Sequence, residues 1–247
     1  MRSFTIASTI LLAATSALAA PLNSTLHFYG KRDAVCGLDF RALVNKAACI
    51  PTGVQFSLTP PSTINKVKLT AEELKTGPAN AQCDHLVELQ LLDSVAQRSG
   101  ICNIMVALVA ADPKQSKVAL LAKASTDISA LQNLNFLEAT VNNRKKTVIQ
   151  RSLKSAAQES TPLDKAVGNF LRLVQADGTA VARTLDAELS HIKATAAAVL
   201  KTLPDGKSTR DKATVVKKNL DTALKNFNGA ITVTGEWNKV VAAAPHS

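Results

Sequence analysis

Two separated segments of the chain hold the residue types that could carry out chemistry on a substrate. They read Cys83-Asp84-His85-Leu86-Val87-Glu88-Leu89-Gln90 and Asn133-Leu134-Asn135-Phe136-Leu137, and the second continues through Asn142-Asn143-Arg144-Lys145-Lys146-Thr147. An imidazole changes its protonation state near neutral pH, and carboxylate and amide oxygens bind hard divalent cations. Hydrolysis of a phosphodiester needs an activated water and a cation that stabilises charge on the phosphate.

At these positions the chain resembles the HNH family of endonucleases, whose active site is built on a ββα-metal core. The first signature of the family is Asp-His followed by an apolar residue at the end of a strand, which matches Asp84-His85-Leu86. The second signature is Asn-Leu-x-x-Leu, followed by His or Asn and then by Lys at fixed spacing. The residues at those positions are Asn133, Leu134, Leu137, Asn142 and Lys145. The resemblance covers residues 83–148.

The resemblance implies that the chain is a metal-dependent nuclease acting on DNA or RNA. His85 would be the general base that takes a proton from water, and Asn133 would hold the His85 loop through hydrogen bonds. Asp84 and Asn142 would supply oxygen ligands to Mg²⁺ or another divalent cation, with Asn143 in place of Asn142 if the register shifts by one residue. The phosphate would be contacted by three adjacent basic residues, Arg144, Lys145 and Lys146.

The chain departs from the family pattern in several respects, one of which is that the sequence after His85 looks helical where the family usually continues in a loop or strand. His85 and Asn133 are 48 positions apart, which requires a helical insertion over roughly residues 91–130 between the two signatures. The paired cysteines that hold a structural zinc in many HNH proteins are replaced by Glu138 and Val141.

The same residues also have a purely structural interpretation. Asp84 and Glu88 could be favourable charges at the start of a helix, asparagines often form turns and caps, and the basic run could be a solvated face. The chain would then be a non-catalytic secreted helical protein that binds a host protein, cell-wall polymer or lipid. Its Ala-, Val-, Leu- and Lys-rich helices over residues 163–227 could present an amphipathic face for that purpose.

The N-terminal residues predict secretion and processing. Residues 1–20 have a basic start, an apolar stretch and a small-x-small cleavage site, which is typical of a signal peptide. Residues 21–32 end in a dibasic pair and resemble the propeptides that kexin-like proteases remove from fungal secreted proteins. The mature chain would begin at Asp33 and be extracellular, as a toxin or host-directed effector. No later segment is apolar enough to predict a transmembrane helix.

The charge favours polyanionic partners. The chain carries 29 basic and 19 acidic residues, and without residues 1–32 the net charge falls from +10 to +7. Such an excess favours nucleic acid, anionic membrane or wall polymer, although it is also compatible with ordinary solvation. Aromatic residues are few, and the single Tyr lies in the segment predicted to be removed. This argues against carbohydrate stacking and against aromatic binding of single strands.

Four cysteines in the first half of the mature chain predict two disulfides in an oxidising compartment. They are Cys36, Cys49, Cys83 and Cys102. Three pairings are open, and the ease of closing short loops favours Cys36–Cys49 and Cys83–Cys102. The spacings form no CxxC pair and so do not favour a zinc knuckle.

Residue periodicity predicts a mainly α-helical fold in which an α+β arrangement is also possible. Residues 33–160 would form a disulfide-containing domain around a small ββα-metal-like core. A short helix is expected within 38–47, a strand over 54–58, and helices over 70–77, 85–99 and 117–131. Residues 101–111 should be a buried helix or strand, and 134–153 should include a helix.

Residues 161–247 predict a bundle of about three helices. Apolar residues recur at helical spacing over 163–175, 180–203 and 211–226. Asp177-Gly178 and Pro204-Asp205-Gly206 are expected to form the turns between them. Residues 240–247 are expected to be a tail.

Overall fold

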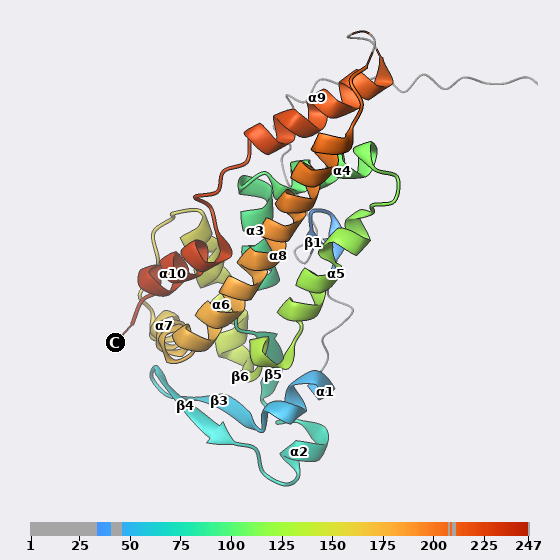
Figure 1. Ribbon diagram of the computed structural model, residues 1–247. Helices are drawn as coiled ribbons and strands as arrows, with labels where there is room; N and C mark the ends of the chain where they lie inside the picture. Colours follow the sequence, from blue (N-terminus) through green and yellow to red (C-terminus); the bar gives the residue numbers. More distant parts are fainter. Residues whose placement is uncertain (1–33, 41–45, 207, 209–210, 247) are drawn as a thin grey trace, which may run out of the picture.

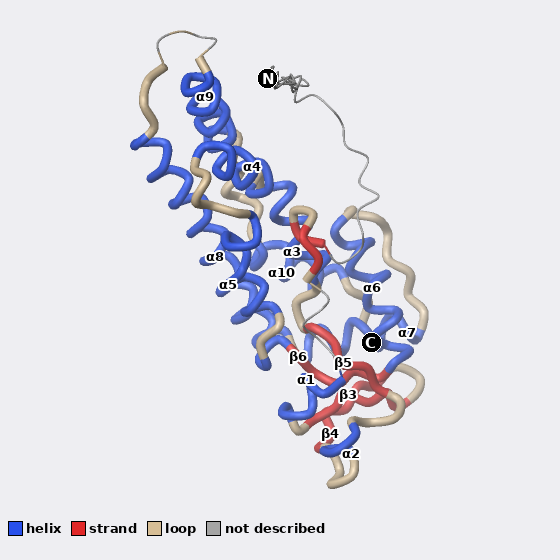
Figure 2. Tube along the Cα trace, turned by 90° about the vertical axis from the view of Figure 1, so that its right-hand side faces the viewer, coloured by secondary structure: helices blue, strands red, loops and turns tan. Residues whose placement is uncertain are grey.

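The protein is mainly α-helical, with a small mixed sheet at one end of an elongated arrangement of helices (Figure 1, Figure 2). The computed structural model describes residues 34–40, 46–206, 208 and 211–246. The predicted signal peptide and propeptide, residues 1–20 and 21–32, lie outside the described residues. No described helix is by itself both long and apolar enough to cross a membrane, although α3 (Leu89–Arg98) and α4 (Ile101–Ala111), bent by 70°, reach that threshold together.

The sheet joins segments that are far apart in the sequence. Its strands are β3 (Val54–Thr59), β4 (Thr63–Lys68), β5 (Ala81–His85) and β6 (Leu134–Glu138), in the spatial order β4-β3-β6-β5. The hairpin β3–β4 is antiparallel, β6 runs parallel to β3, and β5 pairs antiparallel with β6. β5 is therefore an edge strand, and its last residue, His85, lies opposite Leu134.

Short elements occupy the N-terminal part of the described chain. They are the ribbon β1 (Ala34–Val35) and β2 (Leu38–Asp39), helix α1 (Lys46–Cys49), the 3₁₀ turn η2 (Ile50–Thr52) and helix α2 (Glu73–Thr76). The short helix expected within 38–47 is thus partly strand β2, and residues 41–45 lie outside the described residues. Thr70 Oγ1 accepts a hydrogen bond from Glu73 N at 3.2 Å, which caps α2.

A helical insertion separates β5 from β6, as the spacing between the two signatures requires. It consists of α3, α4 and α5 (Lys117–Ile128), and the 3₁₀ turn η3 (Leu131–Asn133) then leads into β6. Leu91, Leu92 and Val95 bury one face of α3, and Ser116 Oγ caps α5 by accepting from Ala119 N. Residues 101–111 are a helix, not a strand.

The helix expected from His85 starts later than predicted, whereas the helix expected within 134–153 is confirmed and is preceded by a strand. Residues 81–85 and 134–138 pair with each other in β5 and β6, and the helices begin only at Leu89 and Ala139. Helix α6 (Ala139–Leu153) starts where the Glu138 carboxylate accepts hydrogen bonds from Thr140 N and Val141 N, at 2.9 and 3.0 Å. Helical periodicity cannot reveal a strand whose partner lies about 50 residues away.

The C-terminal helices share one core with the insertion. They are α7 (Pro162–Leu173), α8 (Gln175–Thr202), α9 (Lys212–Lys225) and α10 (Val233–Ala243). A capping box formed by Thr161 and Asp164 starts α7. The long helix α8 runs beside α4, α5 and α10 (Figure 1, Figure 2). Buried residues from Val35 to Ala244 form one continuous hydrophobic cluster.

Two predictions for this half are wrong. Asp177-Gly178 is not a turn but part of α8, where Gly178 lies against Trp237 of α10. A Cβ atom at Gly178 would lie 2.3 Å from a ring carbon of Trp237, so the glycine makes room for the ring. Residues 240–243 are not a tail but the last turn of α10, in which Val240 and Val241 are buried.

All four cysteines form disulfides, but the expected pairing is wrong. The bonds are Cys36–Cys102 and Cys49–Cys83, with Cα–Cα distances of 5.2 and 5.5 Å. β1 packs on α3 and brings Cys36 to the start of α4, while α1 packs on β5. Because loop-closure entropy grows only logarithmically with loop length, tertiary packing outweighs the preference for short loops.

Candidate functional site

The candidate site is a strand–strand–helix unit made of β5, β6 and α6. α6 packs against both strands, at the sheet end of the molecule (Figure 1). Successive strand residues point to opposite faces. Asp84 contacts Lys145 of α6, whereas Cys83 is bonded to Cys49 of α1 on the other face. The unit therefore brings together residues from both signature segments.

Lys145 is the central charge of the site. Its side chain is fully buried, and its Nζ donates to an Asp84 carboxylate oxygen and to the His85 carbonyl oxygen, the latter at 2.5 Å. Nζ also lies 2.9 Å from Glu88 Oε1 and 5.6 Å from the centroid of the Phe170 ring. The ammonium group thus ties the end of β5 and the start of α3 to α6.

The site carries a net negative charge in a poorly solvated place. Asp84 and Glu88 face the single ammonium group of Lys145, and Asp84 is only 8 % exposed. Burial raises the pKa of Asp84 to about 7, with a further contribution from Glu88, against the opposing effect of Lys145. Burial lowers the pKa of Lys145, but the two carboxylates outweigh it and the net shift is upward. An additional positive charge at this place would be favourable.

Asn142 places its amide between two residues of β5. One end of the amide is 2.8 Å from Gln82 Oε1, and the other is 3.0 and 3.1 Å from the two carboxylate oxygens of Asp84. With its NH₂ group toward Asp84 the amide donates hydrogen bonds to the carboxylate. With its oxygen toward Asp84, two oxygen donors converge on one point. Exchange of the two orientations needs only a rotation of the side-chain amide.

Asn133 fixes the chain directly after His85. Its fully buried side chain accepts from Val87 N at 2.8 Å and donates to Val87 O at 3.1 Å and Ile128 O at 2.7 Å. Its backbone oxygen accepts from Leu86 N at 2.7 Å. The chain leaving β5 is therefore held by several hydrogen bonds to one residue.

His85 is the last residue of the edge strand and is partly exposed. Strand alternation directs its side chain to the face opposite Asp84, so the structure does not place the imidazole beside Lys145 and Asn142. Among the described strands, β5 has a neighbour on one side only. Asp84 and His85, which lie on opposite faces of β5, therefore both border this edge of the sheet. A phosphate bound at the edge could reach both side chains.

The three basic residues expected to contact phosphate have different surroundings. Lys145 is enclosed, as described above. Arg144 is paired with Asp164, through Nε–Oδ1 at 2.6 Å and Nη2–Oδ2 at 3.1 Å, and also with Glu159. Lys146 is half-buried, and its ammonium group forms no ion pair with the described residues. It is the one of the three that can meet a phosphate without breaking an existing ion pair.

The donor atoms fit a hard cation better than a soft one. Within the described ranges, no cluster of three or more His, Cys, Asp or Glu residues is arranged to hold a metal. Asn142 would add an oxygen to those of Asp84 only with its amide turned over, since in the hydrogen-bonded orientation its NH₂ group lies 3.0 and 3.1 Å from the Asp84 carboxylate oxygens. Mg²⁺ keeps several waters and is commonly bound through one or two protein oxygens.

Sequence reasoning missed two residues of the site. Glu88 was expected only as a helix-terminal charge, and Gln82 was not singled out. Both contact α6, through Lys145 and Asn142. Alternation along a strand would have placed Gln82 and Asp84 on one face once β5 was recognised, but no sequence signal pairs Glu88 with Lys145.

Comparisons with protein-family models, curated proteins and solved structures gave no match to this chain.

Proposed function

We propose that the chain is a secreted, divalent-cation-dependent nuclease of the HNH type. One observation carries the proposal. Asp84 lies within contact distance of both Asn142 and Lys145, although they are 58 and 61 positions further along the chain. The elements that bring them together are two antiparallel strands followed by a helix, the order that the resemblance implies.

Asp84 and Asn142 would hold the cation, which would supply charge stabilisation on the phosphate and leaving oxygen. Lys145 keeps the Asp84 carboxylate in place through its buried ion pair, and Asn133 keeps the turn after His85 in one conformation. Lys146 is the residue available to the substrate phosphate.

His85 would accept the proton of the attacking water. The residue is partly exposed at the end of the edge strand, with its Nε2 atom buried, and imidazole is the side chain most often used as a general base. The His85 backbone carbonyl is anchored by Lys145, so the ring stands on a fixed part of the chain. The substrate would approach the free edge of β5, which both Asp84 and His85 border.

In this proposal the protein acts outside the cell. Two disulfides cross-link the chain, which is typical of oxidising compartments, and the N-terminal residues have the features of a signal peptide and propeptide. The positive net charge suits a nucleic-acid substrate. A toxin or a host-directed effector is the class of secreted protein that fits this combination.

A cleavage assay on residues 33–247 tests the proposal. Plasmid DNA and total RNA are incubated with the protein in Mg²⁺, in Mn²⁺ and in EDTA. We expect metal-dependent cleavage that falls at least about 100-fold in His85→Ala, the scale of general-base catalysis. The matched control is His191→Ala, since His191 is exposed on α8.

Asn142→Ala and its neighbour Asn143→Ala separate the cation ligand from a surface residue. We expect Asn142→Ala to abolish cleavage and Asn143→Ala to leave it unchanged, because Asn143 is exposed on α6. No cleavage by the wild-type protein, or cleavage that survives His85→Ala, would refute the nuclease and favour a non-catalytic binding protein.

A further inference from the structure

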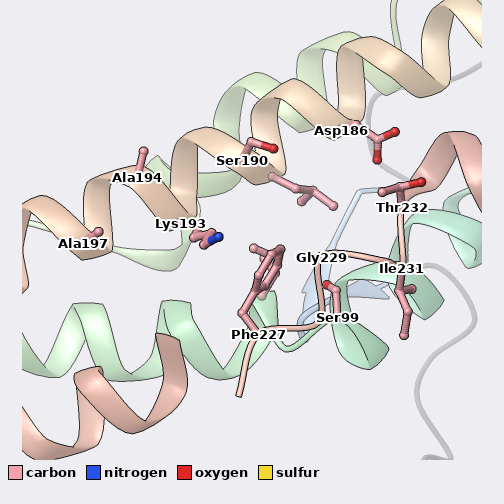
Figure 3. Close-up of a pocket in the computed structure, with 12 residues that line it drawn as sticks. Ser99, Asp186, Ser190, Lys193, Ala194, Ala197, Phe227, Gly229, Ile231 and Thr232 are labelled. Atoms are coloured by element: carbon pink, nitrogen blue, oxygen red, sulfur yellow. The ribbon is translucent and has the colours of Figure 1, made fainter. Parts of the chain in front are cut away.

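A groove in the helical half of the molecule has the features of a ligand site. It lies between α8, the junction of α3 and α4, and the loop from α9 to α10 (Figure 3). Its volume is about 390 Å³, within the range of about 300–1,000 Å³ that is usual for small-molecule sites. None of the residues of the candidate nuclease site lines it.

The walls of the groove are largely apolar. Leu189, Ala194 and Ala197 of α8 line the groove, as do Phe227 and Ile231 of the loop. Phe227 and Ile231 are only partly buried, although they pack against the hydrophobic core. An apolar body lying between these side chains would complete their burial, which favours binding.

Ser99 supplies a polar group that lacks a partner. The residue lines the groove and is only 2 % exposed, and its Oγ atom is buried without any hydrogen bond. Its backbone oxygen, by contrast, accepts from Asn228 N at 2.9 Å. A buried hydroxyl without a partner destabilises the fold. An oxygen atom of a bound molecule would remove that destabilisation.

One acidic and one basic side chain line the groove, and they differ in what they already contact. The carboxylate of Asp186 is already used, since it accepts from Val233 N at 2.6 Å and Thr234 N at 3.0 Å at the start of α10. Lys193 is the one cation among the described residues of the lining. It is exposed, forms no ion pair within the described residues, and lies 4.5 Å from the centroid of the Phe227 ring. Its charge is therefore available at the mouth of the groove.

We infer that this groove binds a small organic anion with an apolar body, of the class of long-chain carboxylates. The hydrocarbon part lies between α8 and the Phe227–Ile231 loop, the carboxylate meets Lys193, and Ser99 Oγ forms a hydrogen bond with an oxygen of the ligand. The inference does not depend on the nuclease proposal, because the two sites share no residue.

A fluorescence titration of residues 33–247 with dansyl-undecanoic acid tests the inference. We expect saturable binding at one site per chain, with displacement by hexadecanoate. Lys193→Gln should weaken hexadecanoate up to about fivefold, the scale of an exposed ion pair, and leave displacement by hexadecanol unchanged. Ser99→Ala should weaken binding by a factor of about 2–10, the scale of one neutral hydrogen bond.

A variant in which a large side chain fills the groove tests whether the ligand binds there. Ala194→Trp adds a large side chain at an exposed position that lines the groove, and Ala198→Trp adds the same side chain at an exposed position of α8 outside it. We expect binding to be lost only in Ala194→Trp. Absence of saturable binding to the wild type, or equal binding by both variants, would overturn the inference. A dimer of the chain that Ala194→Trp dissociates would instead assign the groove to self-association, which also overturns it.

Discussion

At the residue scale, the electrostatics of the candidate site depend on Lys145. Its ammonium group is the only charge that compensates Asp84 and Glu88 in the described part of the site. Removing one partner of a buried ion pair leaves an uncompensated buried charge and costs about 3–5 kcal/mol. The Lys was expected to contact phosphate, and the structure gives it a positioning role because the side chain of this helix residue points inward.

We expect Lys145→Met to lower the free energy of unfolding by about 3–5 kcal/mol in urea titrations followed by circular dichroism. The matched control is Lys146→Met, whose half-buried side chain has no ion pair in the described structure and should cost less than about 0.5 kcal/mol. Asp84→Asn/Glu88→Gln/Lys145→Met removes all three charges and should recover most of the loss. Equal, small effects of the two single substitutions would contradict the role given to Lys145.

The effect of Mg²⁺ on the free energy of unfolding can be measured for the wild type and for the Lys145→Met variant. If Asp84 and Asn142 bind the cation, Mg²⁺ should stabilise the folded state by mass action. The stabilisation should be larger in Lys145→Met than in the wild type, because the ammonium group no longer competes for Asp84. Asn142→Ala should remove it.

At the element scale, the sequence predicted the helices that stand alone and missed the elements that depend on a distant partner. The helix over 117–128 has its own cap and its own apolar face, so local residues determine it. Residues 134–138 form a strand only because β3 and β5 flank them. The order of signature residues was predictable from the resemblance, but the direction of the His85 side chain was not, since it depends on where β5 ends.

Gly178 illustrates the same point within α8. Glycine next to aspartate predicts a turn, yet Gly178 is there because Trp237 packs against the helix backbone. In an ordinary helix Gly→Ala gains up to about 1 kcal/mol. Here a methyl group would overlap the Trp237 ring, which is fully buried and donates from Nε1 to Gln175 O at 3.2 Å.

We therefore expect Gly178→Ala to destabilise the protein by about 1–3 kcal/mol, the cost of overpacking a core. Thermal unfolding can be followed by the fluorescence of Trp237, the single tryptophan. In a Trp237→Leu background, measured by circular dichroism, the cost of Gly178→Ala should disappear because the smaller side chain leaves room. If Gly178→Ala destabilises both backgrounds equally, close packing against the Trp237 ring is not the cause of the destabilisation.

At the scale of the whole molecule, the two disulfides lie in two different hydrophobic clusters. Cys36–Cys102 joins β1 to the start of α4, whereas Cys49–Cys83 joins α1 to β5 one residue before Asp84. The sequence predicted that all four cysteines would pair, because composition and compartment determine that. It could not predict the partners, because these follow from the packing of β1 on α3 and of α1 on β5.

Removing the two disulfides one at a time should lower the stability to a similar extent but should affect nuclease activity differently. Cys36→Ala/Cys102→Ala and Cys49→Ala/Cys83→Ala open loops with sequence separations of 66 and 34. The chain-entropy estimate is about 4 kcal/mol for each, with the longer loop costing only about 0.6 kcal/mol more. Urea titration should therefore give similar losses. Nuclease activity, measured where both variants are fully folded, should fall only in Cys49→Ala/Cys83→Ala, since that bond holds the strand that carries Asp84 and His85. Equal losses of activity in the two variants would mean that the bond beside Asp84 does not position the site.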